Sequence, residues 1–332
     1  MSNKLKYFFS EYDSLTTSSI KFEKNSIFVA YPGENNDGRD FIPQAIQNGA
    51  SAILYDSIDY EWNNEWKIPH LALKNLGQNL SIIASDFYND PSKKIDVIGV
   101  TGTNGKTSCS YWLTNCLNIL KSKSGFVGTM GYGNLSKLTP LSNTTPSAIH
   151  CQQIISELSS KAFKSIVMEI SSHGIEQGRV SAIDFNIKLF TNLTRDHLDY
   201  HETIEKYEEV KTSFMLQSKK SVIVVNVDDK VGQNIYSKTV EQSQKFSYAI
   251  DNDANVRAVN IKYLRDSTQF DLLYDNETSV VSAPIIGKFN IYNILGVIGC
   301  LISMGYKVNK IIGSLQFLES VPGRLEFINK SS

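Results

Sequence analysis

The chain has 332 residues, of which 41% are hydrophobic and 20% charged, and its 33 basic and 34 acidic side chains leave a formal net charge of −1. This length predicts about two packed domains. The balanced charge argues against non-specific binding of nucleic acid or of an acidic membrane surface. The four cysteines show no paired zinc-ligand spacing and are too few for a disulfide-stapled secreted module. The composition therefore predicts an ordinary globular protein with reduced thiols, as in the cytoplasm.

Two segments bear on export and membranes. The stretch from Met1 to Glu11 reaches charged and hydroxyl side chains before an apolar run long enough for a signal peptide, so no export signal is predicted. The uncharged run from Phe289 to Tyr306 lies at the lower length limit of a membrane-spanning helix. Because it contains two asparagines, a serine and three glycines, we interpret it as a buried helix of a globular domain.

The first 90 residues alternate short apolar runs with helical patterns, which is typical of a small α/β domain. Strands are expected at 26–30, 52–55 and 70–73, and helices at 42–49 and about 76–88. The polar, proline-containing stretch 89–94 then indicates a domain boundary. We therefore expect an N-terminal domain of residues 1–90 and a second domain of residues 91–332.

From residue 95 onward, β-branched runs are separated by helical stretches, and several runs are apolar throughout, as buried parallel strands are. These runs lie at 95–100, 165–170, 187–190 and 221–227, and residues 256–281 are expected to form two or three more strands, as in an antiparallel flap. Right-handed crossovers would place the loops at the carboxyl ends of the parallel strands on one edge, where such sheets bind ligands. The expected fold class is α/β.

A candidate phosphate-binding loop follows the strand at 95–100. The segment Thr101 to Thr107 reads Thr-Gly-Thr-Asn-Gly-Lys-Thr and precedes a helical stretch from Ser108 to Leu120. The strict pattern has one more glycine where this chain has Val100, so the match is to the shorter form. The candidate nucleotide contacts are Gly102, Thr103, Asn104, Gly105, Lys106, Thr107 and Ser108.

The chemistry of this loop suits a nucleotide. Glycines let backbone N–H groups turn towards phosphate oxygens, Lys106 reaches the β- and γ-phosphates, and the Thr107 hydroxyl can ligate Mg²⁺. The alternative is a glycine-rich turn whose lysine is merely solvated. The flanking strand and helix favour the phosphate loop, and with it a central ATPase-like domain built on a parallel sheet.

Acids, imidazoles and hydroxyls follow the next strands on the same edge. Glu169 lies inside an otherwise apolar run, where a carboxylate is costly unless it is paired or bound to a cation. It is either a structural acid satisfied by backbone amides or a ligand of Mg²⁺ at the phosphate site. The loop from Phe190 to His201 carries two imidazoles, including His197, with two acids and an arginine. We interpret this cluster as functional only because the topology is expected to place it beside Lys106.

Lys211 stands three residues after Glu208 in a helix expected at 205–216. Taken alone, this spacing favours a surface ion pair that contributes a few tenths of a kcal/mol.

In their order along the chain, these segments resemble the Mur ligase family of peptidoglycan synthesis. The resemblance rests on Phe28 to Ala30, Asp37 to Arg39, Phe41 to Ile46, Gly102 to Thr107, Asn143 to Pro146, Glu169 to Gly174, Phe190 to His201, Gly287 to Asn293, and Gly323 to Glu326. The phosphate loop is shared with folylpolyglutamate synthases. Segments 37–39, 171–174 and 196–201 are more particular to the Mur ligases.

The resemblance implies an ATP-dependent ligase that adds the third amino acid to UDP-N-acetylmuramoyl-L-alanyl-D-glutamate through an acyl phosphate, with Mg²⁺. It implies a monomeric cytoplasmic enzyme of cell-wall synthesis whose partners are this UDP-N-acetylmuramoyl dipeptide and an amino acid, with no nucleic acid and no membrane. The implied catalytic residues are Lys106, Lys211 and His197, and the implied metal ligands are Thr107, Glu169, His197 and Lys211, the last as a carbamate.

The resemblance also implies binding residues outside the loop. On the ATP side these are Asn290, Asn293 and Arg324. For the muramoyl peptide they are Ser19, Asn143, Thr144, Thr145, Ser171, Gln177 and Arg179. The N-terminal domain would hold the UDP end near Ser18, Ser19, Asn35 and Asn36.

Two departures from the family pattern stand out. Residues 18–20 are Ser-Ser-Ile where relatives usually have Asp-Ser-Arg, which bears on the uridine contacts. The sequence stops at Ser332, where the family's C-terminal domain, which delivers the amino acid and closes over ATP, should begin, so we expect that third domain to be absent. A non-catalytic binding fragment and a folylpolyglutamate-type ligase remain as alternatives. The sequence also leaves open whether the third amino acid is diaminopimelate or lysine.

Overall fold

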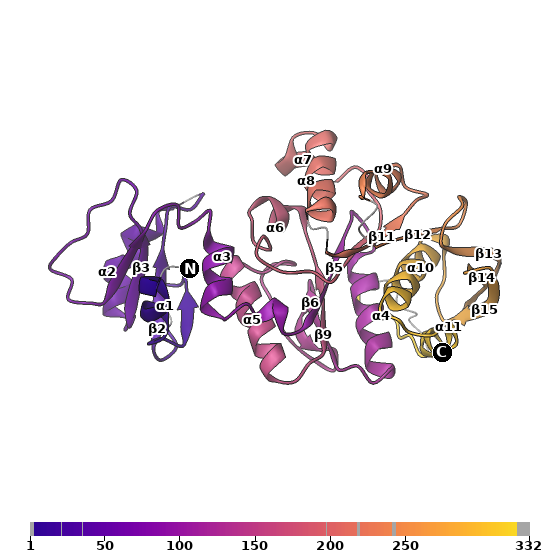
Figure 1. Cartoon of the computed structure of the whole chain (residues 1–332), viewed down its shortest axis with the longest axis horizontal. Helices are drawn as coiled ribbons and strands as arrows, with labels where there is room; N and C mark the ends of the chain where they lie inside the picture. The colour runs from indigo at the N-terminus through magenta and orange to yellow at the C-terminus, as the bar shows by residue number, and fades with distance from the viewer. Residues whose placement is uncertain are drawn as a thin grey trace, which may run out of the picture. The chain divides into compact units, whose positions relative to one another are not determined.

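A computed structural model describes residues 3–20, 22–34, 36–196, 198–217, 220–240 and 244–323 (Figure 1). Contacts divide the chain into two compact units. The first comprises Met1–Pro91, Ser147–Gln153 and Gly178–Ile183, and the second comprises Ser92–Pro146, Ile154–Gln177 and Asp184–Ser332. The first unit thus recruits two short segments that the sequence assigned to the second domain.

The first unit is built on a four-stranded sheet in the order β1-β2-β3-β4, with all pairs parallel. Its elements are α1 (Asn3–Phe9), β1 (Ser14–Thr16), β2 (Ser26–Ala30), the 3₁₀ helix η1 (Gly38–Phe41), α2 (Ile42–Gln47), β3 (Ala52–Asp56), β4 (His70–Leu73) and α3 (Leu80–Phe87). The three predicted strands and both predicted helices of this region are confirmed, and β1 is an addition.

Side chains of the central strands divide between the two faces of this sheet, as the two-residue period of a strand requires. Ile27 and Val29 of β2 join a core with the apolar face of α3. Phe28 and Ala30 join a second core with Ile42 of α2. Helices therefore cover both faces, which explains why these strands read as continuously apolar.

The second unit contains an eleven-stranded sheet in the order β15-β14-β13-β12-β11-β10-β5-β9-β6-β7-β8. The pairs from β13 to β6 are parallel, and the outer pairs at both ends are antiparallel. The strands are β5 (Asp96–Thr101), β6 (Ser124–Gly128), β7 (Gly131–Asn134), β8 (Lys137–Thr139), β9 (Ser165–Glu169), β10 (Ile187–Phe190), β11 (Val222–Asn226), β12 (Lys245–Ala249), β13 (Val256–Tyr263), β14 (Thr268–Tyr274) and β15 (Glu277–Ala283).

The parallel strands predicted in this region are confirmed, and so is the group of further strands at 256–281. Strands β6 to β8 and β12 were not predicted. Two glycines weaken the strand signal of β6, and Gly125 lies in a tightly packed place, where a Cβ atom would be 3.0 Å from Leu158 Cδ1.

The helices from Pro91 onward are η2 (Pro91–Lys93), α4 (Lys106–Ile119), α5 (Ala148–Ser160), α6 (Ser172–Glu176), α7 (Leu198–His201), α8 (Ile204–Leu216), α9 (Lys230–Lys238), α10 (Lys288–Ser303) and α11 (Val308–Leu315). Pro91 of η2 and the start of α5, up to Gln153, belong to the first unit. Helices α4, α10 and α11 contribute to one large apolar cluster with the strands (Figure 1). The uncharged run from Phe289 is thus a buried helix, as predicted. None of the helices in the described ranges has both the length and the apolar character needed to span a bilayer.

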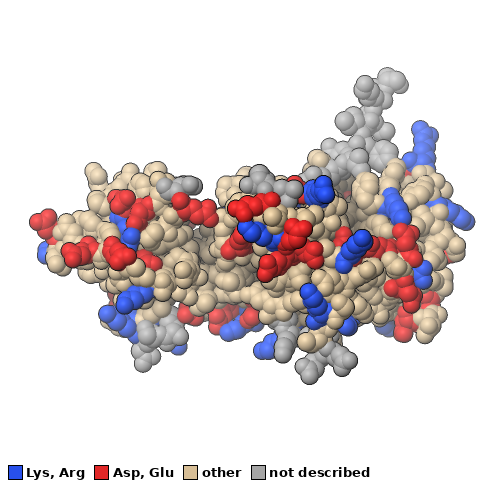
Figure 2. Space-filling view, turned by 90° about the horizontal axis from the view of Figure 1, so that it is seen from above, with Lys and Arg blue, Asp and Glu red and all other residues tan. Residues whose placement is uncertain are grey.

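Acidic and basic side chains are interspersed on the face that Figure 2 shows. This distribution agrees with the near-zero net charge of the sequence.

Lys188 is an unusual element of the second core. It is 2% exposed in the central strand β10, and its Nζ donates to the Phe214 carbonyl oxygen at 2.6 Å and lies 4.7 Å from the centre of the Phe214 ring. Burial lowers the pKa of Lys188 from 10.5 to about 8. Keeping this amine charged at neutral pH therefore lowers the stability of the fold.

We expect Lys188→Met to stabilise the fold at pH 7. The pKa shift corresponds to roughly 3 kcal/mol, partly offset by loss of the hydrogen bond and the cation–π interaction, which leaves a gain of about 1–2 kcal/mol. The unfolded chain binds this proton more tightly between pH 8 and 10.5, so wild-type stability rises through that window and the advantage of the variant shrinks. Urea unfolding at pH 7 and pH 10 measures both values. A variant less stable at pH 7, or a gain that grows with pH, would contradict this account.

Candidate nucleotide-binding site

The candidate phosphate loop joins β5 to α4 and requires glycine at two positions. Gly102 has φ +144° and a Cβ there would lie 1.9 Å from Thr191 Oγ1. Gly105 has φ +86°, and a Cβ would lie 2.3 Å from Asn293 Oδ1. Both the backbone conformation and the lack of space therefore exclude a side chain. Helix α4 begins immediately afterwards at Lys106, so its N-terminal N–H groups face the loop.

The segment after β10 holds this loop in shape. The Thr103 N–H donates to Asn192 O at 2.8 Å, and the Asn104 N–H donates to Asn192 Oδ1 at 3.1 Å. Thr191 Oγ1 in turn donates to Asn104 O at 2.6 Å. The sequence placed residues 191–194 on this edge as part of a cluster of charged groups, whereas their amides and hydroxyls support the loop backbone.

Lys106 is half-buried over the same loop. Its Nζ donates to Gly102 O at 2.9 Å and to Thr103 O at 2.8 Å. An ammonium held at the loop's opening and next to a helix N-terminus is placed to attract phosphate. Ser108 lies in the first turn of α4 and is also half-buried.

Glu169 lies at the end of β9 and contacts Thr107. The Thr107 hydroxyl donates to Glu169 Oε2 at 2.9 Å, and the Thr129 N–H donates to Oε1 at 2.9 Å. Glu169 is 1% exposed. Burial raises the pKa of this carboxyl, against the opposing effect of hydrogen bonds from Thr129 and Thr107 and the charge of Lys106.

Two neighbours of Glu169 were missed by sequence reasoning. Gly128 ends strand β6, and a Cβ there would lie 2.1 Å from Glu169 Oε1. Thr129 follows it and donates through both N–H and hydroxyl. The Gly128–Thr129 pair could have indicated these contacts only if β6 had been predicted as a buried strand ending there, and it was not.

The chemistry of Thr107 and Glu169 fits Mg²⁺. A hydroxyl and a carboxylate supply the hard oxygen atoms that this ion prefers, and the buried carboxylate would gain the cation whose absence makes it costly. Within the described ranges, no three His, Cys, Asp or Glu side chains come together as a metal cluster. Few protein ligands are typical of Mg²⁺ at a nucleotide, where phosphates and waters complete the shell. His197, the third proposed ligand, lies outside the described residues.

Lys211 is fully buried in α8 and points at the phosphate loop. Its Nζ donates to Gly102 O at 3.0 Å and to Thr101 Oγ1 at 3.3 Å, and it lies 4.8 Å from the centre of the Tyr207 ring. Burial, and then the charge of Lys106, lower its pKa well below the usual value. The surface ion pair with Glu208 that the spacing favours is therefore wrong, since Lys211 is 0% exposed.

The two asparagines proposed on the ATP side lie in the first turns of α10. Asn293 is buried against Gly105, and its Nδ2 donates to Asn290 Oδ1 at 3.2 Å. The amide of Asn290 donates to Ile286 O at 2.9 Å. Asn293 therefore adjoins the phosphate loop and Asn290 contacts it through Asn293, whereas Arg324 lies outside the described residues.

Several proposed substrate contacts of the second unit gather around Glu169. Thr144 Oγ1 lies 3.1 Å from Thr129 Oγ1. Thr145 is buried, donates to Glu169 O at 2.9 Å and accepts the Ser171 N–H at 2.9 Å. The Ser171 hydroxyl accepts the Gly174 N–H and so caps α6. Thr145 and Ser171 are thus partly engaged in holding the backbone, while Thr144 remains on the surface of the site.

The remaining proposed substrate contacts are more scattered. Asn143 Nδ2 donates to Ser142 Oγ at 3.4 Å, and Gln177 Nε2 donates to Tyr200 Oη at 3.4 Å. In the first unit, the Ser19 hydroxyl donates to Gln44 Oε1 at 2.6 Å, and the Arg179 carbonyl accepts the Ser81 hydroxyl at 3.5 Å. Asn35 lies outside the described residues.

His201, the second imidazole of the 190–201 loop, is buried rather than open to a ligand. Its Nδ1 lies 3.3 Å from Glu176 Oε2, and its ring centre lies 5.1 Å from that of Tyr207. This placement suits a packing role between α6 and α8.

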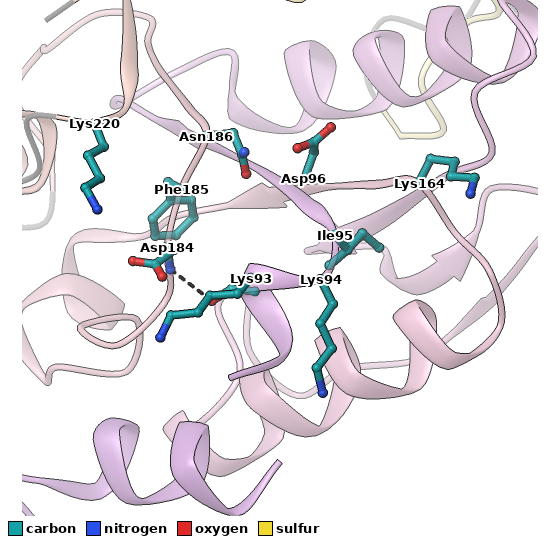
Figure 3. A pocket seen from close by; sticks show the side chains of 10 residues that line it. Lys93, Lys94, Ile95, Asp96, Lys164, Asp184, Phe185, Asn186 and Lys220 are labelled. Atoms are coloured by element: carbon teal, nitrogen blue, oxygen red, sulfur yellow. Dashed lines mark hydrogen bonds between the residues drawn. The ribbon is translucent and has the colours of Figure 1, made fainter. Parts of the chain in front are cut away.

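A separate pocket of about 460 Å³ opens at the amino ends of β5 and β10 (Figure 3). Its lining includes Lys94, Lys164 and Lys220, whose side-chain amines lie well apart in Figure 3. The phosphate loop follows the carboxyl end of β5, so this pocket lies on the opposite edge. Because open parallel sheets bind ligands at their carboxyl edge, we assign the candidate site to the loop and not to the pocket.

The fold and the loop together define a phosphate-loop α/β protein. Comparison with known families refines this class. The family model described as "Mur ligase middle domain" matches residues 100–301, and the model described as "Mur ligase family, catalytic domain" matches residues 11–88. The chain belongs to the Mur ligase family.

Its relatives include UDP-N-acetylmuramoyl-L-alanyl-D-glutamate–2,6-diaminopimelate ligases. The chain is 36% identical to that of Coxiella burnetii, covering 95% of this chain and 66% of the relative. It is 33% identical to that of Nitrosomonas europaea, covering 94% and 62%. The chain thus spans slightly less than two thirds of the length of these relatives.

Solved structures agree with this assignment. A structure of UDP-N-acetylmuramoyl-L-alanyl-D-glutamate–2,6-diaminopimelate ligase matches with a TM-score of 0.82 at 26% identity, covering 94% of this chain and 64% of that one. MurF ligase from Thermotoga maritima in complex with ADP matches with a TM-score of 0.69 at 20% identity, covering 97% and 68%. The second likeness concerns the fold alone.

Proposed function

We propose that this chain acts in the ATP-dependent addition of the third amino acid to UDP-N-acetylmuramoyl-L-alanyl-D-glutamate. The observation that carries the proposal is the convergence of Lys106, the Thr107–Glu169 pair and Lys211 on one glycine loop. The names of the relatives favour 2,6-diaminopimelate as the amino acid to test first. We further propose that the chain acts as a monomer in the cytoplasm.

The proposed reaction activates a carboxylate that cannot otherwise lose its oxygen. The side-chain carboxylate of the D-glutamyl residue attacks the γ-phosphorus of ATP and releases ADP, and the amine of the amino acid then displaces phosphate from the acyl phosphate. Lys106 neutralises charge that develops on the γ-phosphoryl oxygens, so this chain contributes positioning and electrostatic stabilisation. Bound Mg²⁺ would supply further positive charge there, held by Thr107, Glu169, His197 and a carbamate on Lys211.

Substrate binding is proposed to involve both units. The muramoyl peptide would contact Asn143, Thr144, Thr145, Ser171, Gln177 and Arg179, and the first unit would hold the UDP end with Ser19. Asn290, Asn293 and Arg324 would lie on the ATP side. Thr144 and Ser171 contact Thr129 and Thr145, which both bond to Glu169, and this supports a substrate carboxylate close to the phosphate loop.

Titration calorimetry on the chain of residues 1–332 tests this proposal. We expect binding of UDP-N-acetylmuramoyl-L-alanyl-D-glutamate and, separately, of a non-hydrolysable ATP analogue with Mg²⁺, because residues proposed for both ligands belong to this chain. A folate serves as the control ligand, and no binding is expected. Binding of folate in place of the UDP compound would instead indicate a folylpolyglutamate-type ligase. Absence of binding to both nucleotides would refute the proposal.

A further inference from the structure

Asp228 is a hub of hydrogen bonds beside the candidate site and has no role in the proposed reaction. It follows β11, and its Oδ2 accepts the N–H groups of Ile250 and Asp251 at 2.7 and 2.8 Å. Its Oδ1 accepts the N–H and the side-chain amide of Asn252, both at 2.8 Å. The Tyr292 hydroxyl donates to Oδ2 at 2.9 Å. One carboxylate thus joins the loop after β12 to helix α10.

The charge of Asp228 suits this position. Burial raises its pKa, but the backbone N–H groups of Asp251, Ile250 and Asn252 and the Tyr292 hydroxyl more than offset this, so the pKa is lowered overall. Hydrogen bonds to an ionised acceptor are stronger than those between neutral groups. The link to Tyr292 is therefore a charge-assisted one.

Different side chains at the start of α10 contact the acids Asp228 and Asp251 and the phosphate loop. Tyr292 and Lys288, four residues apart, face the acids: Lys288 Nζ pairs with Asp251 Oδ2 at 2.9 Å. Asn290 and Asn293, three residues apart, meet each other, and Asn293 adjoins Gly105. A rotation of this helix end that carried Tyr292 away from Asp228 would therefore also move Asn293 on the phosphate loop.

Apolar packing of Ile291, Ile294 and Leu295 seats this helix end in the core, and polar contacts on the side of the acids add direction to that packing. The helix N-cap is Gly287, which has no side chain to cap the first turn. The Lys288–Asp251 pair is more than half exposed on both sides, and such pairs contribute little. The half-buried Tyr292 hydroxyl, which donates to Asp228 Oδ2 at 2.9 Å with Asp251 Oδ2 as a longer alternative acceptor at 3.3 Å, is thus the directional contact of the helix end on this side.

We propose that Asp228 and Tyr292 are positioning residues for the nucleotide: their hydrogen bond fixes the first turns of α10 so that Asn293 stays against Gly105, and it thereby sets the affinity for ATP. The proposal rests on the proposed function of the loop as an ATP site. It assigns no direct contact with ATP to either residue.

Tyr292→Phe tests this, because it removes the hydroxyl and keeps the ring. We expect the affinity for a non-hydrolysable ATP analogue with Mg²⁺ to fall about tenfold, as loss of a hydrogen bond to a charged group would do. The affinity for UDP-N-acetylmuramoyl-L-alanyl-D-glutamate should stay unchanged. Tyr306→Phe, at a half-buried tyrosine after α10, is the matched control and should alter neither affinity. Equal ATP affinity in Tyr292→Phe and wild type would overturn the proposal, as would equal losses for both ligands.

A second measurement does not depend on nucleotide. Hydrogen exchange of the amides at 292–296, in the ligand-free chain, should be faster in Tyr292→Phe than in Tyr306→Phe if the hydrogen bond holds the helix end. Unchanged exchange would contradict the positioning role even if ATP bound normally. Should wild type bind no ATP, the affinity claim falls together with the proposed function, while faster exchange would show that the mechanical link exists. Asp228→Asn should exceed Tyr292→Phe in both effects, because the amide nitrogen cannot accept hydrogen bonds.

Discussion

Replacing Lys106 by alanine is expected to lower the proposed ATP turnover strongly and to weaken ATP binding while the chain stays folded. The Nζ atom donates to loop carbonyls at 2.9 and 2.8 Å from a half-buried position, so truncating the side chain removes little packing. Removing a charge-assisted hydrogen bond to phosphate costs several kcal/mol at the transition state, equivalent to a rate reduction of about 1,000-fold. Phosphate release and calorimetric ATP titration measure the two effects.

Lys164→Ala is the matched control for this variant. Lys164 is an exposed lysine of the same unit that lines the pocket at the amino ends of the strands. It should leave ATP binding unchanged. Wild-type turnover in Lys106→Ala, or equal losses in the two variants, would show that the glycine loop does not bind phosphate.

Lys211→Ala is expected to lower the turnover of the ligase by about 100-fold, with partial recovery on adding formate or acetate. Burial favours the neutral amine, which can attack CO₂ and release a proton to give an anionic carbamate. Loss of that anion would remove a proposed Mg²⁺ ligand beside the phosphate loop. A small carboxylate can occupy the vacated space and restore a negative charge.

Two controls separate this role from simple loss of packing. Lys211→Met keeps most of the side-chain volume and should lose activity equally, with little rescue because the space stays filled. Lys188→Met alters a second buried lysine among the described residues of the same unit, and carboxylates should not affect it. A ¹³C-bicarbonate spectrum of wild type that shows no lysine carbamate, together with failure of rescue, would leave Lys211 as a structural donor to Gly102.

The local elements of this protein were predictable because their signals are local. Strand β5, the glycine loop and the start of α4 follow from a β-branched run, two glycines with positive φ and a helical pattern. The buried parallel strands were likewise recognisable, since helices on both faces leave them continuously apolar. From these, the edge on which the site forms could be inferred, because all parallel strands of one sheet end on the same side.

Interactions between distant segments were not predictable from local patterns. The sequence favoured a surface ion pair for Lys211, because an i, i+3 spacing does not reveal that the helix presents this face to the phosphate loop. It likewise could not bring Thr129 to Glu169, since the glycines of β6 weaken its strand signal, and the closeness of Gly128 to Glu169 arises only in the folded sheet. The segments 147–153 and 178–183 join the first unit through contacts with residues far away in the sequence, which local patterns do not reveal.

The sequence by itself therefore determined the fold class, the phosphate loop with Lys106 and Thr107, and the presence of an acid on the neighbouring strand. Only the tertiary structure decided which of these groups touch: Glu169 on Thr107, Lys211 on Gly102 and Asn293 on Gly105. The reason is physical, because periodicity and turn chemistry depend on residues a few positions apart, whereas the register of β5, β9 and β10 and the seating of α8 and α10 are set by packing of the whole core.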